Sequence, residues 1–183
     1  MKLILSSFAF LAITISSTAQ LRKTTGNNAR LNKFENAVDY NDFIVNEQTR
    51  IGMAIKGFNT SFEGSNDTVE IHAARQAIVR QADSAVDRMK KLAPYKGDTS
   101  LKKNAMSLFA FYSKIADKEY KQFVWVYFSK EKTAEQKSKE LQDIVNDITE
   151  REKIYDSNFL EAQKAFAAKY NIKLTENEFK IDQ

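Results

Sequence analysis

The sequence predicts an all-α protein, an antiparallel up-down-up-down four-helix bundle with long helices. Three observations favour this fold. Apolar residues recur at steps of three and four over four long stretches, only one Pro and five Gly occur among 183 residues, and turn residues separate the stretches. Hydrophobic residues make up 43% of the chain and charged residues 28%, which is enough apolar side chain to build a core.

Residues 1–19 have the pattern of a secretory signal peptide. Lys2 supplies a positive charge before a short apolar run, and Ser17 and Ala19 are the small residues that signal peptidase needs before Gln20. A retained membrane anchor is the alternative, but it needs about 20 apolar residues and serines interrupt this stretch. We therefore expect cleavage after Ala19 and an exported protein, either periplasmic or at the cell surface, without a transmembrane span after cleavage.

The bundle is expected to occupy residues 29–170, preceded by a flexible leader at residues 20–28 that has no apolar periodicity. The first helix is predicted over about residues 29–60, because its apolar residues share one helical stripe. This stripe consists of Leu31, Phe34, Val38, Val45, Ile51, Ile55, Phe58 and Phe62.

The second helix is predicted over about residues 67–93. Asp67 and Glu70 have the spacing of an N-cap and its third-position partner in a capping box. Apolar residues then repeat every three or four positions as far as Pro94, which cannot continue a helix because it lacks the backbone N–H.

The third helix is predicted over about residues 99–128 and is the most aromatic part of the chain. Residues Phe123 to Phe128 are six consecutive apolar residues, which could instead form a buried strand. We favour the helix because no partner strand is apparent elsewhere in the sequence.

The fourth helix is predicted over about residues 134–170 and is followed by a tail at residues 171–183. Thr133 and Gln136 form a second capping box at its start. Its apolar series alternates steps of four and three, which is typical of a helix packed lengthwise on its neighbours, and Glu152 is the one polar residue in that series. The connections between the four helices are too short to span a long helix, so neighbours in the chain should run antiparallel.

Two amides on the first helix, Asn41 and Gln48, lie on or beside its inward face. A satisfied network of buried amides can fix the register of packed helices. They belong to a longer pattern, made up of Tyr40, Asn41, Asp42, Ile44, Val45, Glu47 and Gln48. This pattern, over residues 38–51, resembles a family of small exported bacterial surface proteins and lipoproteins with no assigned activity. The resemblance implies an exported helical protein, although this chain has no Cys for lipid attachment.

Three aromatic residues of the third helix are candidate partner-binding residues. At about 100° per residue, Trp125 and Phe128 fall roughly 140° to 160° from the centre of the apolar stripe, and Phe111 falls about 100° away. Exposed aromatics of this kind could bind a protein or an envelope glycan, or associate into a homo-oligomer. The alternative is that the tail from Ile172 to Ile181 folds back and covers them.

The sequence carries no signature of catalysis or of a bound metal or cofactor. The chain has no Cys and one His, which excludes thiolate chemistry and the usual multi-histidine metal sites. We expect no cofactor, although a haem held by His72 and Met53 is conceivable because the two residues should lie at similar heights on the second and first helices. Lys and Glu alternate along most of the chain at a net charge of +4, which argues against a nucleic-acid partner.

The expected function is therefore that of a non-catalytic binding or structural module of the cell envelope. One alternative is a carrier of haem or another small ligand in the interior of the bundle. A second alternative is an envelope enzyme that uses the first-helix carboxylates Asp39, Asp42 and Glu47.

Overall fold

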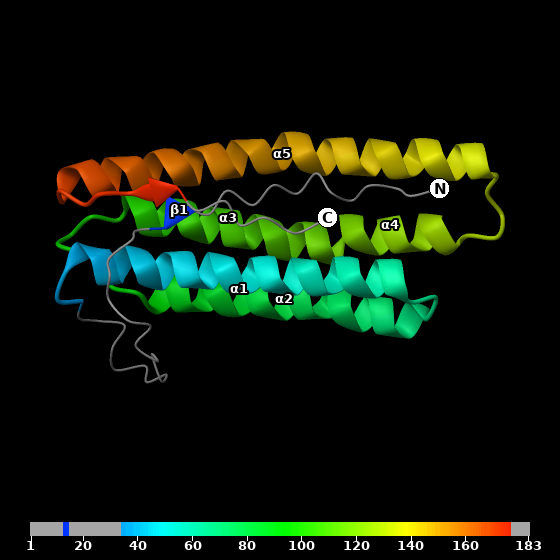
Figure 1. Ribbon diagram of the computed structural model, residues 1–183, viewed down its shortest axis with the longest axis horizontal. Helices are drawn as coiled ribbons and strands as arrows, with labels where there is room; N and C mark the ends of the chain where they lie inside the picture. The colour runs from blue at the N-terminus through cyan, green and yellow to red at the C-terminus, as the bar shows by residue number, and fades with distance from the viewer. Residues whose placement is uncertain (1–12, 15–33, 177–183) are drawn as a thin grey trace.

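The computed structural model of the protein describes residues 13–14 and 34–176 (Figure 1). Within these ranges the chain is helical except for connections and one pair of two-residue strands. Four long helical stretches pack together, as the all-helical prediction expects, and the third of them consists of two consecutive helices, α3 and α4. The predicted leader at 20–28, most of the predicted signal peptide and residues 177–183 lie outside the described residues.

Helix α1 spans Ala37–Gly64 rather than the predicted 29–60. Residues 34–36 are not helical, because Asn36 is the N-cap and its side-chain oxygen accepts a hydrogen bond of 2.8 Å from the N–H of Asp39. The helix continues past its predicted end at residue 60 as far as Gly64, and the N–H of the C-cap residue Ser65 still donates to the carbonyl of Ser61.

Helix α2 spans Thr68–Lys91 and begins at the predicted N-cap. The Asp67 carboxylate accepts a 2.8 Å hydrogen bond from the N–H of Val69, the second helical residue. The last turn carries Arg88, Lys90 and Lys91, whose positive charges are favourable beside the carbonyl end of a helix.

The predicted third helix is divided into α3, Ser100–Asp117, and α4, Glu119–Phe128. The single helix predicted over 99–128 is therefore corrected, whereas the preference for a helix over a strand at Phe123 to Phe128 is confirmed, since those residues are helical. The division falls at Lys118, where φ is −106° and ψ is −69°. Arg75 of α2 is buried at this point, and its Nη1 donates to the carbonyl oxygen of Ala116 at 2.8 Å.

Helix α5 spans Ala134–Lys169, and its first turn contains the predicted capping box. The Thr133 hydroxyl accepts from the N–H of Gln136 at 3.2 Å, and the Gln136 side chain accepts from the N–H of Thr133 at 2.9 Å. A left-handed residue, Asn171 with φ of 54°, follows the C-cap Tyr170, and the N–H of Ile172 donates back to the carbonyl of Ala167 at 2.8 Å.

The two strands join segments that are far apart in the sequence. Strand β1, Ile13–Thr14, pairs antiparallel with β2, Thr175–Glu176. Strand β1 lies inside the predicted signal peptide, and β2 lies inside the predicted tail, for which no strand was expected.

The core lies between helices that pack against one another in a definite order. Close backbone contacts join α1 to α2, α2 to α3, and α3 to α5, whereas α1 and α5 make few. Large side chains bridge α1 and α5 instead, and the rings of Tyr40 and Phe166 stack with centroids 5.5 Å apart. Among the described helices, none has a stretch that is both long and apolar enough to span a bilayer.

Candidate functional site

The strongest candidate site is the surface around Trp125 on α4. The neighbouring residues Phe123, Val124 and Val126 are all buried, so three sides of α4 are covered by the rest of the bundle. The remaining side carries Trp125, which is 59% exposed. The prediction that Trp125 lies off the core is therefore confirmed, although its role in binding stays a prediction.

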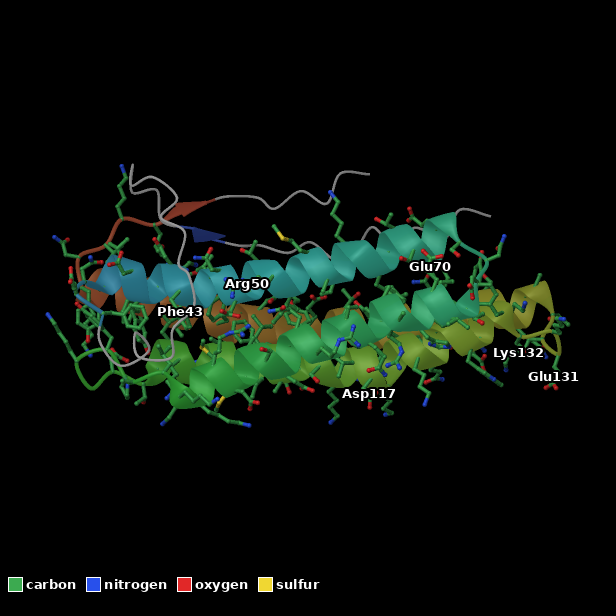
Figure 2. The ribbon with its side chains drawn as sticks, turned by 90° about the horizontal axis from the view of Figure 1, so that it is seen from below. Phe43, Arg50, Glu70, Asp117, Glu131 and Lys132 are labelled. Carbon is green, nitrogen blue, oxygen red and sulfur yellow. The ribbon has the colours of Figure 1, made fainter. Side chains whose placement is uncertain are left out.

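An open groove lies beside the Trp125 ring, at the junction of α3 and α4. We call it the Trp125 groove, and it is lined by Lys114, Asp117, Lys118, Lys121, Gln122 and Trp125. Figure 2 labels Asp117 near this junction and Lys132 beyond the end of α4. The sequence analysis did not predict a role for the three lysines. Their steps of four and three residues, followed by a step of four to Trp125, nevertheless place all of them on one helical face.

The charge of the Trp125 groove is positive because its acidic neighbours are already paired. The carboxylate of Asp117 lies 3.4 Å from the guanidinium of Arg75, and that of Glu119 lies 2.7 Å from Arg151. Within the described part of the chain, Lys114 and Lys121 have no ion-pair partner.

A further cation lies over the tryptophan ring itself. The ammonium of Lys132 is 5.4 Å from the ring centroid of Trp125, within the range of a cation–π interaction. The same ammonium pairs with Glu140 at 3.0 Å, so this contact links the start of α5 to the end of α4.

His72, the one histidine of the chain, lies on α2 and interacts electrostatically with Lys121 of the Trp125 groove. Its pKa is lowered from the ordinary value, first by burial and then by the positive charges of Arg75 and Lys121. The positive charges of Arg75 and Lys121 thus disfavour the charged form of the His72 imidazole.

The two other predicted partner-binding residues are not exposed anchors, and both predictions are corrected. Phe111 is only 4% exposed, because its ring stacks on Tyr155 of α5 with centroids 4.6 Å apart. Phe128 is partly buried against the core, with its ring centroid 6.3 Å from that of Phe62 on α1. Only Trp125 of the three presents most of its ring to solvent.

The haem arrangement is also corrected. Met53 is 59% exposed on α1, so its sulfur does not face an interior space shared with His72. Over residues 13–14 and 34–176, no group of three or more His, Cys, Asp and Glu side chains could hold a metal ion.

The predicted amides Asn41 and Gln48 are both buried. Asn41 accepts a hydrogen bond of 2.9 Å from the side-chain nitrogen of Gln163, which links α1 to α5. The side-chain oxygen of Gln48 is buried without a hydrogen-bond partner among the residues that the structure describes. The role of the two amides in fixing the helix register stays a prediction.

The three carboxylates considered for catalysis have different surroundings: Asp39 is exposed, Asp42 is half-buried and Glu47 is buried. Glu47 is buried, and its two oxygens lie 2.8 Å from Arg50 and 2.5 Å from Arg88. Figure 2 labels Arg50 on α1. Burial, followed by the charge of Asp39, raises the pKa of Asp42. Glu47 is thus held as an ion pair between α1 and α2.

A buried acidic cluster lies between α3 and α5. The hydroxyl of Tyr112 is 3.0 Å from Oε1 of Glu152 and 3.3 Å from Oδ1 of Asp156. Burial raises the pKa of Glu152 to about 8, and the charge of Asp156 adds to this effect. Burial also raises the pKa of Asp156 to about 6. The sequence indicated Glu152 as a polar residue in an apolar series, but neither of its partners.

No protein-family model matches the chain, and neither a curated protein nor a solved structure matches it. The function must therefore be inferred from the residues themselves.

Proposed function

We propose that this protein is an exported, non-catalytic binding module of the cell envelope that makes its contact through the Trp125 groove. The observation that carries the proposal is the exposure of Trp125, at 59%, on a helix whose other large apolar side chains, apart from Tyr127, are buried or half-buried. Burying a large aromatic side chain contributes about 1.5 to 3 kcal/mol, which an exposed ring leaves unused in the free protein. Tryptophan is also enriched among residues that dominate binding energy.

We further propose that the helices form an antiparallel up-down-up-down bundle, which makes a rigid support for this surface. The connections support this arrangement, because residues 65–67, 92–99 and 129–133 are each too few to run the length of a helix. The direction of the colour gradient along successive helical stretches in Figure 1 also favours it.

A non-catalytic role agrees with the state of the acidic groups. Glu47 is neutralised by two arginines, and Glu152 is buried beside Tyr112 rather than in the Trp125 groove. A general acid or base must reach its substrate, which these groups do not do from the core.

The test measures retention of the mature chain, residues 20–183, on immobilised cell-envelope material. We expect Trp125→Ala to weaken retention about tenfold or more, because truncating an aromatic anchor costs about 2 kcal/mol or more. Met53→Ala is the matched control, since it removes an equally exposed apolar side chain, also 59%, from α1. Both variants should keep the unfolding temperature of the parent. Equal retention of the two variants would contradict the proposal.

A further inference from the structure

We infer that the Trp125 groove binds an acidic polysaccharide, with a sugar ring packed on the indole and anionic groups of the chain at the lysines. This inference rests on the proposed function, because it names the ligand class of that same surface. The evidence for this ligand class comes from two parts of the groove, the indole and the lysines.

The lysines and the tryptophan form a linear strip. Lys114 and Trp125 are eleven positions apart, which corresponds to about 16 Å along a helix at 1.5 Å per residue. Lys118 and Lys121 lie between them on the same face, and all four side chains are exposed. A strip of this length suits an extended polymer with repeated charges better than a single small anion.

The charge of the strip favours an anionic ligand. Asp117 is held by Arg75 and Glu119 by Arg151, so these carboxylates offer the lysines little neutralisation. The ammonium of Lys118 is 3.8 Å from Glu119, close to the limit of an ion pair, and is 73% exposed. The lysines can therefore turn toward a ligand without breaking a strong internal contact.

The surroundings of Trp125 favour a sugar over other anionic partners. A membrane surface or a protein interface would call for further apolar side chains beside the ring, whereas the groove places Lys121 and Gln122 there. Single-stranded nucleic acid stacks successive bases on several aromatic rings, and the groove has one. A sugar ring has an apolar face for one aromatic ring and polar groups for Asp117, Gln122 and the lysines around it.

The experiment uses the single tryptophan as its own reporter. The mature chain is titrated with polygalacturonate, a polymer of uronic acid, and with dextran, a neutral polysaccharide. We expect polygalacturonate to change the fluorescence of Trp125, with an affinity that falls as salt is added, and dextran to bind more weakly. Oligothymidylate and vesicles of phosphatidylglycerol are titrated in parallel, and both should bind more weakly than polygalacturonate.

Charge variants test the lysines. The double variant Lys118→Gln, Lys121→Gln should weaken polygalacturonate binding about tenfold or more. The matched control is Lys56→Gln, Lys153→Gln, which removes two exposed lysines from α1 and α5 and should bind as the parent does. Equal loss in the two double variants would overturn the inference, because it would show that net charge alone determines binding.

The two proposals fail in different ways. If polygalacturonate does not bind, or if oligothymidylate or vesicles bind as tightly, the ligand class is wrong. The proposed function still stands if retention on envelope material depends on Trp125. If that retention is also independent of Trp125, both proposals are wrong.

Discussion

The carboxyl group of Glu152 is the clearest case of a residue whose chemistry is set by its surroundings. It is 6% exposed, and its neighbours from three helices are Tyr112 on α3, Tyr120 on α4 and Asp156 on α5. Transfer from water disfavours the charged form of a carboxyl group, so the folded protein holds a proton there at a pH where the unfolded chain has released it.

This difference predicts that the protein becomes less stable as the pH rises. The pKa of Glu152 is raised from 4.5 to about 8 and that of Asp156 from 3.8 to about 6. The stabilising contribution is fully present below about pH 4 and is lost as the pH rises toward about 8, because deprotonation then favours the unfolded chain. The free energy of unfolding should fall across this window by on the order of a few kcal/mol.

Denaturant unfolding at several pH values between about 4 and about 8 checks this. Glu152→Gln keeps the shape of the side chain and cannot ionise, so its stability should depend less on pH than that of the parent. Glu150→Gln, two residues away at an exposed position, should follow the parent. Parallel profiles for Glu152→Gln and the parent would disprove the assignment.

The exposure of a side chain could be predicted from the sequence only where it depends on the position of the residue on its own helix. Trp125 lies on the side of α4 that no helix covers, so its position on the helix was enough to predict its exposure. Phe111 was predicted at the edge of the core, but α5 extends over that edge and places Tyr155 on its ring. The position of α5 depends on contacts between segments far apart in the sequence, which helical periodicity does not contain.

At the scale of the helices, the boundaries set by local hydrogen bonds were predictable and the division of the third stretch was not. Thr133 and Asp67 cap their helices through residues that are two or three positions away. The division at Lys118 has no Pro or Gly to indicate it. Arg75, which is distant in sequence, supplies donors to the carbonyls of Ala116 and Asp117.

We predict that Arg75 stabilises the junction of α3 and α4. Arg75→Met keeps most of the aliphatic volume and removes the donors, which leaves the carbonyl of Ala116 without a hydrogen bond that is now 2.8 Å long. The protein should lose about 2 kcal/mol of stability, within the cost of an unsatisfied buried acceptor, and amide exchange should accelerate over residues 118–122. Arg80→Met, an exposed position of the same helix, is the control. Equal effects of the two substitutions would rule out a specific role for Arg75.

At the scale of the whole molecule, polar residues occupy the seam between α1 and α5, where backbone contacts are few. Asn41 pairs with Gln163 across this seam, and Tyr40 stacks on Phe166 near the same end. Large and polar side chains thus hold two helices together at a greater distance than close apolar packing would allow. The Trp125 groove lies at the α3–α4 junction, where Arg75 of α2 donates to a backbone carbonyl and Arg151 of α5 pairs with the Glu119 side chain.

The whole-molecule prediction concerns removal of residues 1–19. Because the described core cluster extends from Ala37 to Phe166, cleavage after Ala19 removes β1, and with it the β1–β2 pair, and leaves the described helices whole. The chain of residues 20–183 should therefore keep the helix content of the full chain, with an unfolding temperature within a few degrees of it. Circular dichroism checks this, and mass spectrometry of protein recovered from cells should find Gln20 at the amino terminus. A chain that still begins at Met1 would contradict export by cleavage, and an unfolded 20–183 chain would show that the first nineteen residues belong to the fold.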